Sequence, residues 1–488
     1  MDLNQIRVPR GRNPGIRVIR IELLTRINNA METRTGADNQ SQQFPPLGRR
    51  GFLQLAAGVL ATSTAQRAVA AEPETATPPG KDPLLITENP VIVRARDEAL
   101  EILKPSRAHL EHGLELHRQS LVFDSYGFAP RAASDGAALT AADAAGASDA
   151  ELQDLREEMG MIRAVSEPAE RLEIQEALRC SGVTCIFQNA GEEGQSPERL
   201  LKRLARFTYL GDMLRDVLVR AALPDDIEAA HKAGKSCLYL TGNGVPLAQQ
   251  WNTVEDELQY VRTFFQLGIR MMHVTYNRRN MLGDGCAELA NGGLSDFGRA
   301  AIGEMNRVGV IVDVAHSGWR TSLEAAQVSK KPMVASHSTC DALNHHIRAK
   351  PDEVIRAICD TGGLIGICCI PNFLGHSGDI AALIDHVDYV VKKFGIDHVA
   401  IGTDVSHTSQ HASAPAAKSP SRGKRRNRFE SLWPANALGG QWPRAGSLGW
   451  TNWPLFTVAL VQRGYTDEQI RKILGENVLR VCRAALAR

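Results

Sequence analysis

The stretches Val310-Ile-Val-Asp-Val-Ala-His316 and Pro332-Met-Val-Ala-Ser-His337 decide the fold of this chain. Each is a short apolar run that ends in a histidine, and such runs are typical of buried parallel strands. In a parallel barrel, the side chains at the carboxyl ends of the strands face the mouth, where ligands bind. The two imidazoles are therefore predicted to converge on one metal ion. The alternative is a pair of unrelated histidines that form local hydrogen bonds.

Six further apolar runs have the length and composition of strands. They cover residues 121–128, 183–190, 236–243, 271–276, 364–369 and 399–404. Helical patterns occupy residues 149–165, 254–267, 295–308, 322–328, 352–361 and 380–394, and a closing helix is expected at 466–486. Eight strand–helix units predict an α/β fold, a (β/α)8 TIM barrel with insertions, of the metal-dependent hydrolase type. A doubly wound sheet is the alternative.

The composition narrows the class of function. The chain has 488 residues and a formal net charge of +1, which gives no electrostatic reason to expect a nucleic acid as partner. Its 9 cysteines include no Cys-x-x-Cys pair and do not form the framework of a disulfide scaffold. Buried free thiols are expected instead.

The N-terminal sequence predicts export. Arg49-Arg50 precedes a short, weakly apolar stretch and the sequence Ala68-Val-Ala70, a pattern that resembles a twin-arginine signal peptide. The apolar stretch is too short to span a bilayer, and no other stretch of membrane length follows it. We therefore expect a periplasmic or extracellular protein whose mature chain has no transmembrane span. Met31 is a plausible alternative start.

Three segments follow from this interpretation. Residues 1–71 form an N-terminal extension with the signal peptide, and residues 72–90 form a linker rich in Pro, Thr and Glu. Residues 91–488 form the barrel domain. The basic segment 418–428, after the last strand, is more typical of a solvated loop than of a site for a polyanion.

Two charged residues are expected to join the histidines at the mouth of the barrel. Asp404 ends the run Ala400-Ile-Gly-Thr-Asp404, where a carboxylate can act as a general base, a metal ligand or a proton donor to a leaving amine. Capping of the next helix is the alternative role for Asp404. Arg348 follows the second histidine strand, and its planar guanidinium fits a substrate carboxylate. An ordinary surface arginine is the alternative there.

Residues 254–404, with a further match at 472–477, resemble the membrane (renal-type) dipeptidase family of zinc barrels. The motifs that carry the resemblance are Val274-Thr-Tyr-Asn277, Gly283-Asp-Gly285, Val312-Asp-Val-Ala-His316, Ala335-Ser-His-Ser338, Ile347-Arg348 and Ile401-Gly-Thr-Asp404. The resemblance implies an eight-stranded barrel, a zinc site and the hydrolysis of dipeptides to amino acids. It also implies that His316 and His337 are metal ligands, that Arg348 binds the substrate carboxylate and that Asp404 is the acid or base.

One half of the family's metal site is not matched. Where the family's first strand ends in His-x-Asp, this chain has Tyr126 and Phe128, and where its third strand gives a bridging glutamate, it has Thr241 or Asn243. Two divalent cations a few ångströms apart repel each other, and a bridging carboxylate offsets that repulsion. A tight dinuclear site is therefore not expected. One zinc ion is predicted, with a second left open.

Because the chain lacks these metal ligands, other residues are predicted to complete the site. A zinc site needs about three protein ligands and an open position. The candidates for the third ligand are Asp404, Asp124 and Asn243, and Asp124 is the predicted one. Tyr276 stands where the family has a histidine, and it is expected to donate a hydrogen bond to the developing oxyanion; a packed tyrosine is the alternative. The adjacent Asn277 is taken as a substrate contact.

The sequence thus predicts a zinc-dependent dipeptidase that cleaves a dipeptide or a similar small amide with a metal-activated water. Two alternatives remain. The first is a mononuclear hydrolase of another small amide or of a lactone. The second is a barrel that has lost catalysis and binds a ligand. The substrate is a small molecule in each case, and a homodimer remains open.

Overall fold

The computed structural model describes residues 82–191, 194–412, 432–435 and 437–487. The chain divides into two units, Met1–Glu74 and Thr75–Arg488, and all described residues belong to the second unit. The predicted signal peptide lies outside the described residues. Residues 82–89 of the predicted linker are described, and Asp82 and Asn89 among them are buried.

Parallel strands form the core of the domain in the order β1-β2-β4-β5-β6-β7-β9-β10. Their bounds are β1 Phe123–Gly127, β2 Cys185–Asn189, β4 Ser236–Gly242, β5 Ile269–His273, β6 Ile311–Asp313, β7 Val334–Cys340, β9 Leu364–Ile367 and β10 Val399–Ile401. Two short strands stand beside this path: β3 (Leu218–Arg220) pairs with β4, and β8 (Ala349–Lys350) pairs with β7. Each of the eight predicted runs contains or overlaps one of the strands on the path.

Residues beyond β10 close the barrel against β1. The amide of Asp404 donates to the carbonyl of Tyr126 at 3.0 Å, and the amide of Thr403 donates to a carboxylate oxygen of Asp124 at 2.9 Å. The sheet therefore curves back on itself, so the fold is the predicted barrel and not an open doubly wound sheet.

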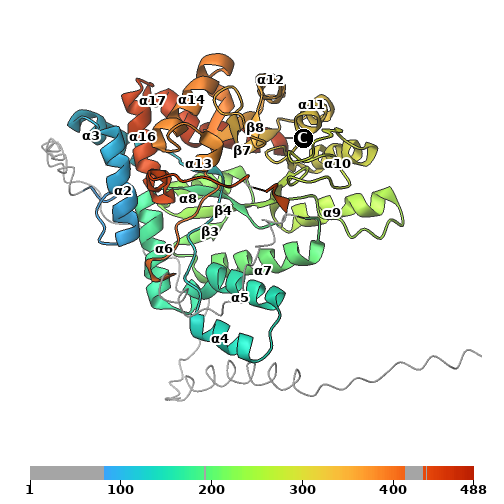
Figure 1. Ribbon diagram of the computed structural model, residues 1–488, viewed down its shortest axis with the longest axis horizontal. Helices are drawn as coiled ribbons and strands as arrows, with labels where there is room; N and C mark the ends of the chain where they lie inside the picture. The colour runs from blue at the N-terminus through green and yellow to red at the C-terminus, as the bar shows by residue number, and fades with distance from the viewer. Residues whose placement is uncertain (1–81, 192–193, 413–431, 436, 488) are drawn as a thin grey trace, which may run out of the picture. The chain divides into compact units, whose positions relative to one another are not determined.

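Helices surround the strands, as Figure 1 shows. In the first half of the domain they are α2 Pro90–Leu103, α3 Arg107–Gln119, α4 Gly136–Ala144, α5 Asp149–Ile162, α6 Pro168–Ser181, α7 Pro197–Met213, α8 Pro224–Lys232 and α9 Val254–Gln266. In the second half they are α10 Asp296–Val308, α11 Trp319–Val328, α12 Asp352–Asp360, α13 Pro371–Leu374, α14 Ile380–Phe394, α16 Trp453–Gln462, α17 Asp467–Arg471 and α18 Asn477–Leu486. Among the described residues, no helix is both long and apolar enough to cross a membrane.

Local signals set the ends of the helix that leads into β6. Ser295 caps α10, because its hydroxyl accepts from the amide of Gly298. At the other end, Gly309 has a φ of 96°, a left-handed conformation that glycine adopts at no steric cost and that ends the helix. Val310 then starts the apolar run, and β6 is buried along its whole length.

The predicted closing helix is interrupted. A π-helical turn at Lys472–Glu476 separates α17 from α18. A Cβ atom at Gly475 would lie 2.3 Å from the carbonyl oxygen of Leu121, so glycine permits the close approach of this turn to the chain that enters β1. Val478, Val481 and Cys482 of α18 then pack into the apolar cluster at the barrel's centre.

The cysteines behave as the composition predicts. All nine are free thiols in the structure, and each is buried except Cys286, which is partly exposed.

Candidate metal and substrate site

The structure brings the two predicted histidines together. His337 lies within β7, and His316 follows β6 by three residues. Their Nε2 atoms are 3.0 Å apart, and the two side chains are 3% and 0% exposed for His316 and His337. Adjacent parallel strands carry both residues, as the paired apolar runs predict.

Hydrogen bonds fix which nitrogen of each ring carries the proton. The hydroxyl of Ser336 donates to Asp313, so its oxygen accepts from Nδ1 of His337 at 2.8 Å. The amide oxygen of Asn277 accepts from Nδ1 of His316 at 2.7 Å. Each Nε2 atom therefore presents a lone pair to the other.

Two lone pairs at this separation repel each other unless a cation lies between them. Two nitrogens bound to one tetrahedral zinc ion at about 2.0–2.1 Å stand roughly 3.3 Å apart, close to the observed spacing. Burial lowers the pKa of His316 and of His337 well below the usual range, and the positive charge of Arg348 lowers both further. Both rings are thus held neutral, which is the state that binds a metal. The pair fits one divalent metal ion.

A third imidazole, missed in the sequence, lies beside this pair. His273 is the last residue of β5, and its Cα pairs with that of Asp313 on β6. Its Nε2 lies 2.7 Å from Oδ2 of Asp313. His273, Asp313 and His337 offer ligand atoms that all lie within 4.8 Å of one another, the only such group among the described residues. They are further candidates to hold the metal.

Asp313 is also a positioning residue for the histidine pair. Its oxygens accept from the amides of Ala315 and Ser336 at 2.9 and 3.1 Å, besides the Ser336 hydroxyl. Burial alone would raise the pKa of Asp313, but its electrostatic interaction with His273 and the hydrogen bonds from Ser336 and Ala315 outweigh burial and lower the pKa. The resulting carboxylate orients Ser336 and through it the ring of His337.

The opposite half of the mouth is filled by neutral side chains. Tyr126 stacks on His337 with ring centroids 3.8 Å apart, and its hydroxyl donates to the amide oxygen of Asn243 at 2.5 Å. Phe128 packs edge-on against Tyr126 at 5.9 Å. A phenol, a phenyl ring and an amide thus stand where the resemblance places the ligands of another metal. These residues do not fit a second metal ion.

Asp124 is not brought to the histidine pair. One of its oxygens accepts from the hydroxyl of Thr403 at 2.6 Å and from the indole of Trp450 at 3.1 Å, and the other accepts from the amide of Thr403. Burial raises the pKa of Asp124 to about 7, although the hydrogen bonds from Thr403 and Trp450 lower it. Its contacts join the two ends of the barrel sheet, and they give no support to the predicted role as third metal ligand.

Arg348 lies at the predicted site but is fully buried. Its Nη1 donates to the carbonyl of Ala315, and its Nη2 donates to the carbonyl of His337 at 2.9 Å. The guanidinium therefore braces the backbone on both sides of the histidine pair. Within the described chain, Nε of Arg348 has no hydrogen-bond partner and the residue forms no ion pair. Its positive charge is available to an anionic ligand.

Asp404 follows β10 by three residues, and its amide donates to the carbonyl of Tyr126 on β1. Its φ of 56° is left-handed, a conformation that is uncommon outside glycine and that often marks functional sites. Burial raises the pKa of Asp404 to about 7, while the charges of Arg348 and Arg131 oppose this rise. A carboxyl group that titrates near neutrality is suited to general acid–base catalysis.

The remaining predicted residues surround His316. Tyr276 stacks on its ring with centroids 4.0 Å apart. Asn277 is fully buried and accepts from His316 and from the thiol of Cys286. Asn277 therefore orients the ring of His316. Its Nδ2 has no hydrogen-bond partner among the described residues, so the predicted contact with the substrate stays a prediction.

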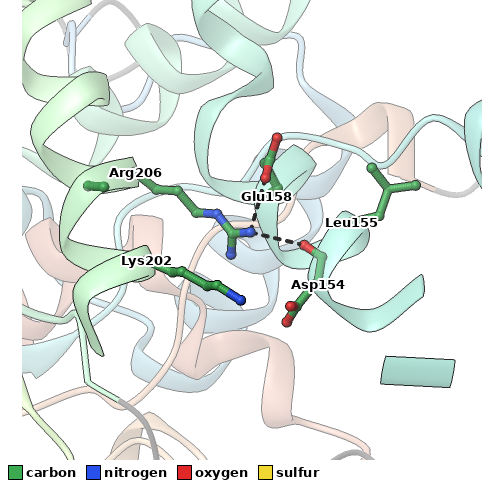
Figure 2. Close-up of a pocket in the computed structure, with 6 residues that line it drawn as sticks. Asp154, Leu155, Glu158, Lys202 and Arg206 are labelled. Carbon is green, nitrogen blue, oxygen red and sulfur yellow. Dashed lines mark hydrogen bonds and ion pairs between the residues drawn. The ribbon is translucent and has the colours of Figure 1, made fainter. Parts of the chain in front are cut away.

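A pocket of about 520 Å³ on the outer helices is a different feature. Figure 2 shows Arg206 of α7 donating to Glu158 and to the carbonyl of Asp154, both on α5. Lys202 of α7 also lines this pocket. It holds charged groups of both signs and none of the residues discussed above, so it is not the site of the predicted chemistry.

Comparison with known proteins gives a consistent picture. The family model described as membrane dipeptidase, peptidase family M19, matches residues 111–414. The dipeptidase tcpJ of Claviceps purpurea is 28% identical over 277 residues, which is 56% of this chain and 56% of that protein. The chain therefore spans little more than half the length of this curated relative.

Solved structures share the fold. An amidohydrolase from Pseudomonas aeruginosa is 26% identical with a TM-score of 0.56, and the match covers 77% of this chain and 99% of that one. A metallo peptidase from Rhodobacter sphaeroides, solved with a phosphinate mimic of the dipeptide L-Ala-D-Ala, is 16% identical with a TM-score of 0.53. That match covers 75% of this chain and 100% of the other, and it bears on the fold alone.

Proposed function

Since the chain belongs to the membrane dipeptidase family, peptidase family M19, we propose that it is a metal-dependent hydrolase that cleaves a dipeptide or a similar small amide. The observation that carries the proposal is the pair of Nε2 atoms of His316 and His337, 3.0 Å apart with both lone pairs directed inward. We propose zinc as the metal and one ion per chain, because neutral residues replace the ligands of a second one.

A bound divalent ion would supply Lewis acidity, which polarises a carbonyl and makes a water molecule more acidic. The protein's own residues do the rest. Arg348 attracts the carboxylate of the substrate, since its buried charge has no ion-pair partner among the described residues. Asp404, with a pKa near 7, takes a proton from the attacking water and returns it to the leaving amine.

The aromatic residues exclude water and fix the metal ligands. Tyr126 stacks on the ring of His337, and Tyr276 stacks on the ring of His316. Trp433 approaches His316 edge-on at 6.2 Å between ring centroids. In such a dry site, electrostatic interactions are stronger than in water. We propose that the hydroxyl of Tyr276 donates to the oxyanion of the transition state.

The experiment that tests this function measures metal content and turnover on the same preparation. Purified protein is expected to hold about one zinc per chain and to hydrolyse small amides that carry a free carboxylate. A chelator should abolish both, and added zinc should restore both. A protein that holds metal but turns over no amide or lactone would instead be a ligand-binding barrel.

We further propose that the protein is exported through its twin-arginine-type sequence at Arg49-Arg50. The support is the sequence pattern alone. Changing both arginines to lysine keeps the charge but removes the pattern. The variant is expected to accumulate in the cytoplasm, whereas the native protein is recovered from the exported fraction. Equal distribution of the two proteins would contradict the proposal.

A further inference from the structure

A row of aromatic rings connects the buried arginine of the site with the histidine pair. The ring of Phe373 on α13 lies between those of His346 and Trp433, with centroids 4.7 and 5.7 Å away and planes 29° and 20° from parallel. The guanidinium carbon of Arg348 lies 5.6 Å from the centroid of Phe373. At the other end of the row, the indole of Trp433 lies 6.2 Å from the ring of His316 and nearly perpendicular to it. Phe373 and Trp433, the aromatic wall, therefore border the space between Arg348 and His316.

Hydrogen bonds fix the segment that carries Trp433. The amide of Arg348 donates to Nδ1 of His346 at 3.1 Å, so Nε2 of that ring carries the proton and donates to the carbonyl of Ala437 at 3.2 Å. The side chain of Asn372 donates to the same carbonyl at 2.6 Å. Ala437 lies four residues beyond Trp433. The loop between β7 and β8 thus holds a segment that follows β10, next to the site.

The connectivity of an amino acid directs its side chain to this wall. In the proposed reaction, Arg348 attracts the free carboxylate, and the amide lies at the metal site of His316 and His337. The carboxylate and the amide nitrogen of the leaving amino acid are attached to the same carbon atom, so this carbon lies between the two sites. Its side chain therefore lies in the space that Phe373 and Trp433 border.

The chemistry of the wall favours an apolar side chain. Phe373 is buried and Trp433 is half-buried, and both offer ring carbons and no charge. Burial lowers the pKa of His346, so the third ring of the row is neutral as well. An apolar side chain that packs here gains free energy in proportion to the area that it removes from water. A polar side chain of the same shape loses its hydration against ring carbons, which offer no hydrogen bond.

We propose that Trp433 is a specificity-determining residue that selects a large apolar side chain, such as that of leucine or phenylalanine, on the leaving amino acid. This inference rests on the proposed function, because it names the substrate class of the same site. The wall lies between the carboxylate-binding arginine and the metal ligands, so it acts on the leaving amino acid and not on the acyl group.

The test compares leaving amino acids that differ in size and polarity. Glycine, asparagine, leucine and phenylalanine are offered as L-alanyl dipeptides and as N-acetyl amino acids, with the chiral residues in both the L and the D form. Leucine and asparagine have the same number and branching of heavy side-chain atoms, so they separate polarity from size. With the zinc-loaded full chain, kcat/KM for leucine and phenylalanine is expected to exceed that for glycine and asparagine at least about tenfold, in the isomer that is cleaved faster. Equal values would overturn the substrate class and leave the hydrolase standing.

Variants of Trp433 locate the preference. Trp433→Ala is expected to reduce the ratio of kcat/KM for leucine to that for glycine at least about fivefold, whereas Trp433→Phe, which keeps a ring beside Phe373, retains most of it. Trp251→Ala removes an exposed indole that packs on Phe297, and it is the matched control. An unchanged ratio in Trp433→Ala would remove Trp433 from the proposal.

The acyl group provides an internal control. With leucine as the leaving residue, the order of kcat/KM among glycyl, alanyl and phenylalanyl dipeptides is expected to be the same in the native protein and in Trp433→Ala. If the variant changes this order as strongly as the order of the leaving residues, Trp433 supports the whole site and does not select the leaving amino acid.

Binding of the released amino acids is a readout that needs no turnover. By isothermal titration calorimetry, free leucine is expected to bind the zinc-loaded native protein at least about tenfold more tightly than glycine, and the difference should shrink in Trp433→Ala. Equal binding of leucine and glycine by the native protein would contradict the selection, whether or not the variant folds. Failure to cleave any member of the panel with metal bound would overturn the proposed function, which is a separate result because product binding does not require catalysis.

Discussion

Two halves of the barrel mouth use different chemistry. The half built by β5, β6 and β7 presents His273, His316 and His337, whose ring centroids lie 5.0–5.4 Å from one another. The half built by β1 and β4 presents the hydrogen-bonded pair Tyr126 and Asn243. The first half leaves lone pairs that a cation can satisfy. The second half satisfies its own polar groups.

The comparison shows that other side chains fill the positions where the resemblance expects the ligands of a second metal ion. Tyr126 is 1% exposed, stacks on His337 and finds a partner for its hydroxyl. A merely decayed metal site would leave unpaired polar groups or a cavity, both of which are costly. This half is packed like a protein core. This packing supports the proposal of one metal ion per chain, since aromatic side chains fill the positions where the resemblance expects the ligands of a second one.

The largest effect is expected from removing a histidine in the half of the mouth built by β5, β6 and β7. His337→Ala should reduce bound zinc from about one per chain to nearly none, and amide hydrolysis by more than about 100-fold, since loss of even an outer-shell partner costs 10–100-fold. Metal analysis and kinetics on the same sample measure both effects. His112→Ala, which changes an exposed histidine of α3, is the control. Retained turnover in a metal-free His337→Ala protein would refute the metal-dependent mechanism.

Rebuilding the second half tests the comparison in the opposite direction. The combined changes Tyr126→His, Phe128→Asp and Asn243→Glu restore the side chains that the resemblance expects there. Bound zinc is expected to rise from about one to about two per chain. Tyr126→Phe keeps the stack on His337 and should stay at one. Two ions in the native protein would show that the aromatic half does not exclude a metal.

A smaller effect is expected for the amide that orients His316. Asn277→Ala removes the acceptor for Nδ1 of His316 and frees the ring to rotate or change its tautomer. Zinc affinity should fall about 10–100-fold, while Asn277→Asp should keep or increase it. Competition with a chromophoric chelator measures the affinity. Equal affinities for the native protein and Asn277→Ala would show that the Asn277 contact is incidental.

The barrel was predictable because each strand is a continuous apolar run with a polar residue at its end. His316 and His337 were predictable for the same reason, since adjacent strands in a parallel barrel bring their carboxyl ends together. Both conclusions need only local sequence and the geometry of the fold. The sequence also shows that Tyr126 and Asn243 stand where the family has metal ligands. It does not show the hydrogen bond that joins these two side chains.

His273 shows what the sequence could not provide. The predicted strand covers residues 271–276, whereas β5 is Ile269–His273. The predicted bounds therefore place Tyr276, and not His273, at the end of the strand. The importance of His273 depends on the register between β5 and β6, which pairs it with Asp313. Register is a tertiary property that no local pattern fixes. The burial of Arg348 and the contacts of Asp124 escaped prediction for the same reason.

The smallest effect is expected at Asp124. This residue tests whether the half of the mouth built by β1 and β4 has a structural role or takes part in metal binding. An aspartate in an unfolded chain has a pKa of about 3.9, whereas burial raises that of Asp124 to about 7. Between these two values the folded protein holds a proton that the unfolded chain has lost. The contribution of Asp124 to stability therefore declines as pH rises from about 4 to 7, and the full cost persists above pH 7.

Asp124→Asn mimics the protonated side chain at every pH and removes this dependence. Relative to the native protein, the variant should gain about 2–3 kcal/mol of unfolding free energy between pH 5 and pH 8. Urea unfolding across this range measures the difference, in which titrations of all other groups cancel. Zinc content should not change, because the oxygens of Asp124 bind Thr403 and Trp450. Loss of zinc in Asp124→Asn would return this carboxylate to the metal site and make the two halves of the mouth partners in one coordination sphere.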